Sequence, residues 1–104
     1  PVRAGPASAV DRFCWQQESP GSDVWVLDVR GPVTNNTGAT IRISTIEVAV
    51  LRGGSQVASV TVPADRTIAP NDVMQWWRDG LRVTITGGAP DAAQVSNVPF
   101  TCVG

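Results

Sequence analysis

Apolar and polar residues alternate over several short stretches of the chain, which is the pattern of half-buried β-strands. Residues 81–85 show it most clearly, with Leu, Val and Ile at every second position. Residues 40–51 give the strongest strand signal, and their Ile, Val and Thr content disfavours a helix. The apolar phase of this stretch changes near Ser44 and Thr45, which predicts either a β-bulge or a strand that switches faces.

Turn-forming residues divide the apolar stretches. The Gly-Gly pair at 53–54 predicts a tight hairpin, and Pro63 is expected to end the returning strand. The Asp-Gly pair at 79–80 is expected to turn the chain, and the Gly-Pro pair at 31–32 to form a bulge or kink. The expected strands cover residues 11–17, 24–30, 40–51, 56–62, 73–78, 81–85 and 94–103. Seven or eight short strands with frequent turns are typical of an immunoglobulin-like antiparallel β-sandwich, so we expect this all-β fold.

The first ten residues are rich in Pro, Ala, Gly and Ser, and they predict a flexible N-terminal arm or linker over residues 1–10. Residues 11–104 are then a single sandwich domain, because 104 residues are enough for one domain and too few for two. Because the chain begins at Pro1 rather than Met, we expect it to be a processed or excised piece.

The charge and the hydropathy of the chain argue against two classes of partner, nucleic acids and membranes. The net charge is −1, so no basic patch for nucleic acid is expected. No apolar run approaches the roughly 20 residues of a membrane span, so we expect no membrane insertion by this segment. All eight basic residues are Arg, which indicates GC-rich codon usage of the kind found in actinobacteria.

The two cysteines lie near opposite ends of the chain, at Cys14 and Cys102. They lack zinc-site spacing, and the chain has neither a His nor a CxxC pair that would support a metal site or a reactive thiol. We therefore predict a disulfide that joins the first and last strands, with two separate buried thiols as the alternative. Such a bond would stabilise the fold by about 4–5 kcal/mol and would place the protein in an oxidising setting, extracellular or at the cell surface.

Three motifs in the middle of the chain follow one another in a recognisable order: GPVTNNTG at 31–38, IEVAVLRGGSQV at 46–57 and TIAPND at 67–72. Over roughly residues 24–77 the chain resembles the FxLYD and LEA14-like extracellular β-sandwich domains of bacteria. In those families a strand ends in a G-x-V-x-N turn, a long strand and a Gly-containing hairpin follow, and an L-x-P-G turn comes next. Asn71 stands where the last motif has Gly. The resemblance implies a sandwich in an envelope or extracellular setting and supplies no catalytic residues.

The residue types present argue against an enzyme. The chain has no His, Tyr or Lys, which removes the commonest general base and every Ser–His or Cys–His pair. The nine acidic residues are scattered, although two carboxylates could still meet in space, as in glycosidases. We expect no metal and no cofactor. A calcium site built from Asp65, Asp72 or Asp79 is the alternative. Asn35 begins an N-glycosylation motif, Asn-Asn-Thr.

Four tryptophans are the most informative residues for function: Trp15, Trp25, Trp76 and Trp77. Trp25 lies in a strongly apolar stretch and is expected in the core, while Trp15 could pack over the disulfide or against the terminal strands. Trp76 and Trp77 are adjacent, so in an extended segment they point to opposite faces and one of them lies outside. Trp15, Trp76 and Trp77 are therefore the candidate binding surface. The alternative is that Trp76 and Trp77 are both buried.

Three functions fit these features. The first is a non-catalytic binding or scaffolding module of a bacterial envelope or secreted protein, which meets a protein partner through sheet edges or loops. The second is a structural subunit of a surface filament, pilus or virion decoration, which assembles with copies of itself through its N-terminal arm. The third is a carbohydrate-binding module that stacks an exposed tryptophan on a sugar ring. We rank them in that order.

Overall fold

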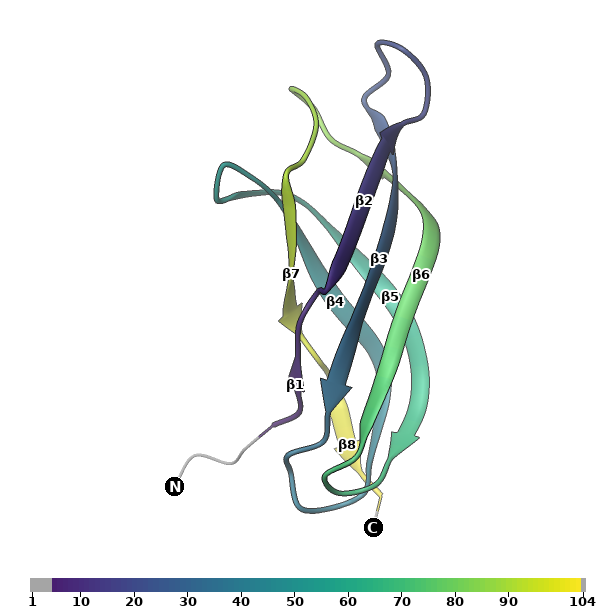
Figure 1. Ribbon diagram of the computed structural model, residues 1–104, viewed down its shortest axis with the longest axis vertical. Helices are drawn as coiled ribbons and strands as arrows, with labels where there is room; N and C mark the ends of the chain where they lie inside the picture. The colour runs from purple at the N-terminus through teal and green to yellow at the C-terminus, as the bar shows by residue number, and fades with distance from the viewer. Residues whose placement is uncertain (1–4, 104) are drawn as a thin grey trace.

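The computed structural model describes residues 5–103, and over that range the chain forms eight β-strands and no helix (Figure 1). The strands are β1 (Ala7–Ser8), β2 (Arg12–Gln17), β3 (Val24–Thr34), β4 (Ile41–Arg52), β5 (Ser55–Ile68), β6 (Val73–Thr84), β7 (Ala92–Asn97) and β8 (Phe100–Cys102). Every pairing is antiparallel, and the strands divide into two sheets that pack against each other. The predicted all-β class and its two packed antiparallel sheets are confirmed.

Each sheet is built around one long central strand. In the first sheet β3 pairs with β6 along one edge, and β1 and β2 follow each other along its other edge. In the second sheet β4 pairs with β5 on one side and with β7 and then β8 on the other. The molecule is therefore long and narrow, with extents of 49 × 26 × 18 Å.

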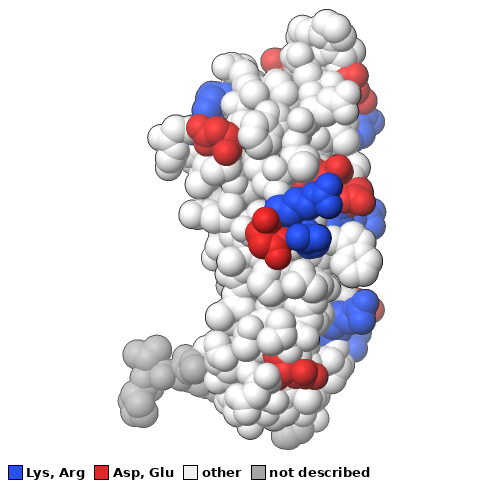
Figure 2. Space-filling view, viewed as in Figure 1, with Lys and Arg blue, Asp and Glu red and all other residues white. Residues whose placement is uncertain are grey.

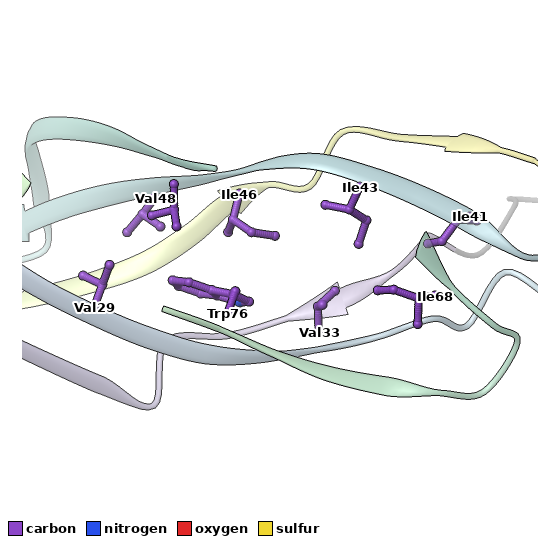
Figure 3. Packing of buried hydrophobic residues seen from close by; sticks show 9 residues of the cluster. Val29, Val33, Ile41, Ile43, Ile46, Val48, Ile68 and Trp76 are labelled. Carbon is purple, nitrogen blue, oxygen red and sulfur yellow. The ribbon is translucent and has the colours of Figure 1, made fainter. Parts of the chain in front are cut away.

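The core lies between the two central strands, because both carry β-branched residues on the side that faces the other sheet (Figure 3). Its main cluster holds Val29, Val33, Ile41, Ile43, Ile46, Val48, Val62, Ile68 and Trp76. A second, smaller cluster of Leu27, Val50 and Ile85 continues it toward the other end. Burying each of these aliphatic side chains stabilises the fold by about 1.5–3 kcal/mol relative to exposure.

The change of apolar phase in β4 lies at a β-bulge in the β4–β5 ladder. Between the pairs Ile43–Arg66 and Thr45–Pro63, β4 has one residue and β5 has two, so the extra residue lies on β5. Strict alternation would place Ile43 and Ile46 on opposite faces of β4, but both are fully buried in the core, so the alternation of β4 breaks where the ladder is bulged. Of the two alternatives that the sequence left open, a bulge is the one found, and its extra residue belongs to the partner strand.

Two expected strand ends lie inside strands instead. β5 runs through Pro63, because it is an edge strand and its outer side needs no N–H donor. The proline lies opposite Thr45, next to the bulge of β5. β6 runs through the Asp-Gly pair at 79–80, where Gly80 has φ = 73° and its N–H donates to Oδ1 of Asp28 (2.9 Å). The strand end predicted at Pro63 and the turn predicted at residues 79–80 are therefore wrong, and each position lies within a paired strand.

Two further boundaries differ from the sequence prediction. β3 continues through the Gly-Pro pair at 31–32. The register shift against β6 lies between Leu27 and Val29 instead, and the extra residue belongs to β6. The expected last strand is divided into β7 and β8 at Val98 and Pro99. The turn at 69–72 is formed as expected, and Asn71 has φ = 64°, a left-handed conformation that Asn tolerates almost as Gly does.

The part of the expected arm that the structure describes, residues 5–10, lies against the first sheet. Ser8 pairs with Val33, and its Oγ donates to the carbonyl of Pro32 (2.7 Å). Gly31 permits this approach, since a Cβ there would lie 1.8 Å from the carbonyl oxygen of Ala9. Residues 1–4 of the arm lie outside the described range.

The predicted disulfide between Cys14 and Cys102 is not formed. Cys14 on β2 is exposed and pairs with Asp28, whereas Cys102 on β8 is exposed and pairs with Ile41 at the far end of the other sheet. Figure 1 shows β2 in the upper half of the sandwich and β8 at its lower end. A disulfide needs Cα atoms within about 7 Å of each other, and two strands so placed do not meet this requirement. The oxidising setting therefore loses the support that the disulfide gave it.

Candidate functional site

Strand alternation in β6 separates the adjacent tryptophans. Trp76 lies opposite Gly31 and points into the core, where only 2% of it is exposed. Trp77 lies opposite Arg30 and points outward, with 58% of its surface exposed. The extended segment thus places one ring on each face, as its alternation predicts.

Trp76 is a structural residue. Its ring lies between the sheets (Figure 3), and its Nε1 donates to Oγ of Ser8 (2.9 Å), so the buried indole N–H is satisfied. Gly31 leaves room for it, because a Cβ at that position would lie 2.9 Å from Cζ2 of the indole. The ring fills the space beneath β1 and fixes that strand, which leaves Trp77 as the tryptophan of β6 that solvent reaches.

Trp77 belongs to a row of side chains that crosses the outer face of the first sheet. The register pairs Arg12 with Arg30 and Arg30 with Trp77, and residues directly opposite in an antiparallel pair share a face. Arg30 is held in place by Asp11, whose Oδ1 lies 3.1 Å from the guanidinium Nε. An indole and two guanidinium groups therefore lie side by side on three neighbouring strands.

Carboxylates border this row on the same face. Asp28 lies opposite Cys14, and Asp79 follows Trp77 by two residues along β6. A hollow of about 160 Å³ is lined by Arg12, Asp28, Val29, Arg30, Trp77 and Asp79. Figure 2 shows charged side chains of both signs gathered midway along the face that β2, β3 and β6 form. The hollow thus has an aromatic wall and charged rims of both signs.

Trp77 also lines a second hollow on its other side. This space, of about 230 Å³, lies where the edges of β5 and β6 approach each other, and its walls include Arg66, Met74 and Gln75. One exposed indole therefore separates two adjacent depressions. We call them the face hollow and the seam hollow.

The other two tryptophans lie elsewhere. Trp15 is 41% exposed, and its ring lies 5.2 Å from that of Phe13, which packs against the core. It therefore belongs to the inner side of β2, at the rim between the sheets, and does not share the face of Trp77. Trp25 is half-buried against the smaller core cluster. The three tryptophans proposed from the sequence do not form one surface.

The side chains around Trp77 could not be chosen from the sequence. Arg12, Asp28, Arg30 and Asp79 come from three strands, and none is unusual in its local sequence. Alternation alone would place Arg12 and Arg30 outside, but their meeting with Trp77 depends on the register of β2–β3 and β3–β6. Register is a long-range property, which the pattern of one strand does not contain.

Several other candidate sites find no counterpart in the described range. No three His, Cys, Asp or Glu side chains of residues 5–103 are grouped as metal ligands, so Asp65, Asp72 and Asp79 do not gather there. Asn35, the acceptor of the glycosylation motif, is fully buried with its amide donating to two carbonyls, so the folded chain does not present it. The described part of the chain also contains no helix of the length and apolarity needed to cross a membrane.

A third groove, of about 410 Å³, lies between β1 and the β7–β8 side of the other sheet. Its walls include the apolar side chains of Val95, Val98 and Phe100 and the polar ones of Ser96 and Asn97. It is the place where the expected arm meets the second sheet, and it contains no charged side chain. The groove is therefore an uncharged opening between the sheets, with walls of mixed polarity.

Comparison with known proteins supplies no relative for this site: no family model, curated protein or solved structure matches the chain. The resemblance to FxLYD and LEA14-like domains stays a prediction. The function has to be argued from the face around Trp77 itself.

Proposed function

We propose that this chain is a non-catalytic binding module and that its ligand contacts the outer face of the first sheet around Trp77. The observation that carries the proposal is the 58% exposure of this indole on a sheet face, between charged side chains of both signs. Tryptophan is among the residues that most often anchor a bound partner, because it offers a large apolar plate at low entropic cost.

Trp77 lies outside the core of the fold. Trp76 fills the core beneath β1, whereas 58% of Trp77 is exposed and neither core cluster includes it. Asp11 holds Arg30, and Asp28 accepts from the backbone of Gly80, so two of the charged neighbours are fixed in place. A face whose polar groups are positioned in advance loses less entropy when a ligand binds.

The sheet edges are poorer candidates than this face. β5 carries Pro63, and β6 has a bulge at Gly80. On the opposite edge of each sheet the outer strand is interrupted, between β1 and β2 near Ala9 and between β7 and β8 at Pro99. Prolines, bulges and short strands are the features that keep exposed edges from pairing with another chain. We therefore favour the face over the partner contacts through edges, or through the arm, that the sequence suggested.

A fragment screen tests the location of the site without assuming a ligand class. Mixtures of monosaccharides, di- and tripeptides and aromatic acids would be added to ¹⁵N-labelled protein, with amide and indole signals followed by NMR. We expect the largest shifts at the Trp77 indole N–H and the amides of Arg30 and Asp79, and their loss in Trp77→Ala. Trp15→Ala is the matched control and should leave them unchanged. Shifts confined to the groove between β1 and β7–β8, or no shifts at all, would contradict the proposal.

A further inference from the structure

We infer that the ligand of this face is an uncharged saccharide chain, one pyranose of which stacks on Trp77 while its neighbours enter the face hollow and the seam hollow. This inference rests on the proposed function and adds the chemical class of the ligand. The observations that carry it are the balance of charge around the indole, the size of the hollows and their position on both sides of one ring.

The charge around Trp77 selects against ionic ligands. Arg12 and Arg30 lie on one side of the face hollow, and Asp28 and Asp79 lie on the other. An anion would meet the two carboxylates, and a cation would meet the two guanidinium groups. A sugar hydroxyl both donates and accepts, so a polyol satisfies guanidinium donors and carboxylate acceptors together. The uncharged ligand is the one that no group of this face repels.

The indole suits the apolar side of a sugar ring. The face of an aromatic ring carries partial negative charge, and the axial C–H groups of a pyranose present partial positive charge to it. The face hollow has one aliphatic side chain in its lining, Val29, which is buried. A protein partner of high affinity would be expected to bury its anchor in a packed, desolvated apolar surround, which Trp77 lacks on the side of the face hollow.

The volumes indicate an extended ligand that lies on the surface. At about 160 Å³ and 230 Å³, both hollows are below the roughly 300–1,000 Å³ of pockets that enclose a compact small molecule. Because Trp77 lines both, a linear ligand can cross the ring and place a unit on each side. The geometry therefore favours an oligosaccharide over a monosaccharide.

The test is a titration with soluble oligosaccharides of one to six units. Gluco-, xylo-, manno- and N-acetylchito-oligosaccharides serve as neutral probes, with oligogalacturonate as the anionic and chitosan oligomers as the cationic comparison, each followed by calorimetry. We expect at least one neutral series to bind, with affinity rising about tenfold or more from one unit to three, which is a gain of about 1.4 kcal/mol. Trp77→Ala should weaken that binding at least about tenfold, as expected for an aromatic anchor. Trp15→Ala, which removes an exposed indole outside both hollows, should leave it unchanged.

The outcomes separate this inference from the proposal beneath it. The fragment screen could show peptides or aromatic acids bound at Trp77 and no saccharide. That result would overturn the inference that the ligand is a saccharide, but it would support the proposed binding face. Tighter binding of either charged series than of every neutral one would also overturn it. Saccharide binding that survives Trp77→Ala would overturn both. Far-UV circular dichroism of each variant shows that its fold is retained.

Discussion

Asn35 joins the two turns at one end of the sandwich. Its Nδ2 donates to the carbonyls of Ala39 (2.7 Å) and Ile68 (2.9 Å), and its Oδ1 accepts from the backbone N–H of Thr37 (3.0 Å) and from its hydroxyl (2.7 Å). The backbone of Asn35 also bonds in both directions to the turn at residues 71–72. Because the residue is fully buried, these bonds replace its contacts with water entirely. A polar group so placed is expected to specify how the two turns meet.

Removing this amide should be costly. We expect Asn35→Ala to lower the free energy of unfolding by about 2–4 kcal/mol, because the carbonyl of Ile68 loses its donor in a buried setting and the carbonyl of Ala39 loses one of its two donors. Asn36→Ala is the matched control, since Asn36 is exposed and a surface change of this kind stays within about 0.5 kcal/mol. Urea denaturation followed by tryptophan fluorescence measures both. Equal losses in the two variants would show that the network adds nothing to stability.

At the level of elements, β1 shows how one missing side chain positions a segment. Gly31 lies opposite Trp76, and the absence of its Cβ lets the chain at Ala9 pass directly over β3. Ser8 then bonds to both Pro32 and Trp76, so the indole, the hydroxyl and a carbonyl form a continuous chain of hydrogen bonds. The close packing of β1 therefore depends on Gly31 for reasons of space, without any need for a positive φ.

A methyl group at Gly31 should displace β1. We expect Gly31→Ala to destabilise the fold by about 1–3 kcal/mol, the usual cost of overpacking, because its Cβ would meet backbone at 1.8 Å. Amide hydrogen exchange of Ala9, whose N–H donates to the carbonyl of Pro32, should rise at the same time. Gly5→Ala is the control, since a Cβ there meets its nearest atom, Cε1 of Phe100, at an ordinary 3.7 Å. Unchanged exchange at Ala9 in Gly31→Ala would contradict this account.

The elements also show what the sequence could predict. Alternation located most strands, the Gly-Gly pair located the hairpin at 53–54, and the broken phase of residues 40–51 indicated the bulge in the β4–β5 ladder, because each of these signals is local. The predictions from Pro63 and from the Asp-Gly pair at 79–80 were wrong because they depend on tertiary contacts. Pro63 is tolerated because β5 is an edge strand, and the Asp-Gly pair stays within β6 because Gly80 donates to Asp28. The face around Trp77 needed the same information: the ring was recognisable from the sequence, but its charged neighbours were not.

At the scale of the whole molecule, the sandwich is narrow and depends on its apolar clusters. Each central strand has at most one hydrogen-bonded partner strand on each side, so the two edges of each sheet lie close to the core. A domain of about 100 residues has a net stability of only about 5–15 kcal/mol. A covalent link between first and last strands would supply a large fraction of that, and the separation of Cys14 from Cys102 means that the fold must do without it.

The absence of this link predicts how the protein responds to reductant. We expect the urea midpoint to be the same with and without dithiothreitol, and the non-reduced intact mass to lack the loss of two hydrogens that a Cys14–Cys102 bond would cause, because β2 and β8, which carry these residues, belong to different sheets and lie at different heights. Cys14→Ser should change the free energy of unfolding by no more than about 0.5 kcal/mol, as for other exposed positions. A mass lower by two hydrogens, with a loss of about 4–5 kcal/mol on reduction, would instead restore the terminal disulfide. Because the core clusters, Asn35 and β1 hold the fold without that bond, we expect the Trp77 face to keep its geometry in reducing and oxidising solution alike.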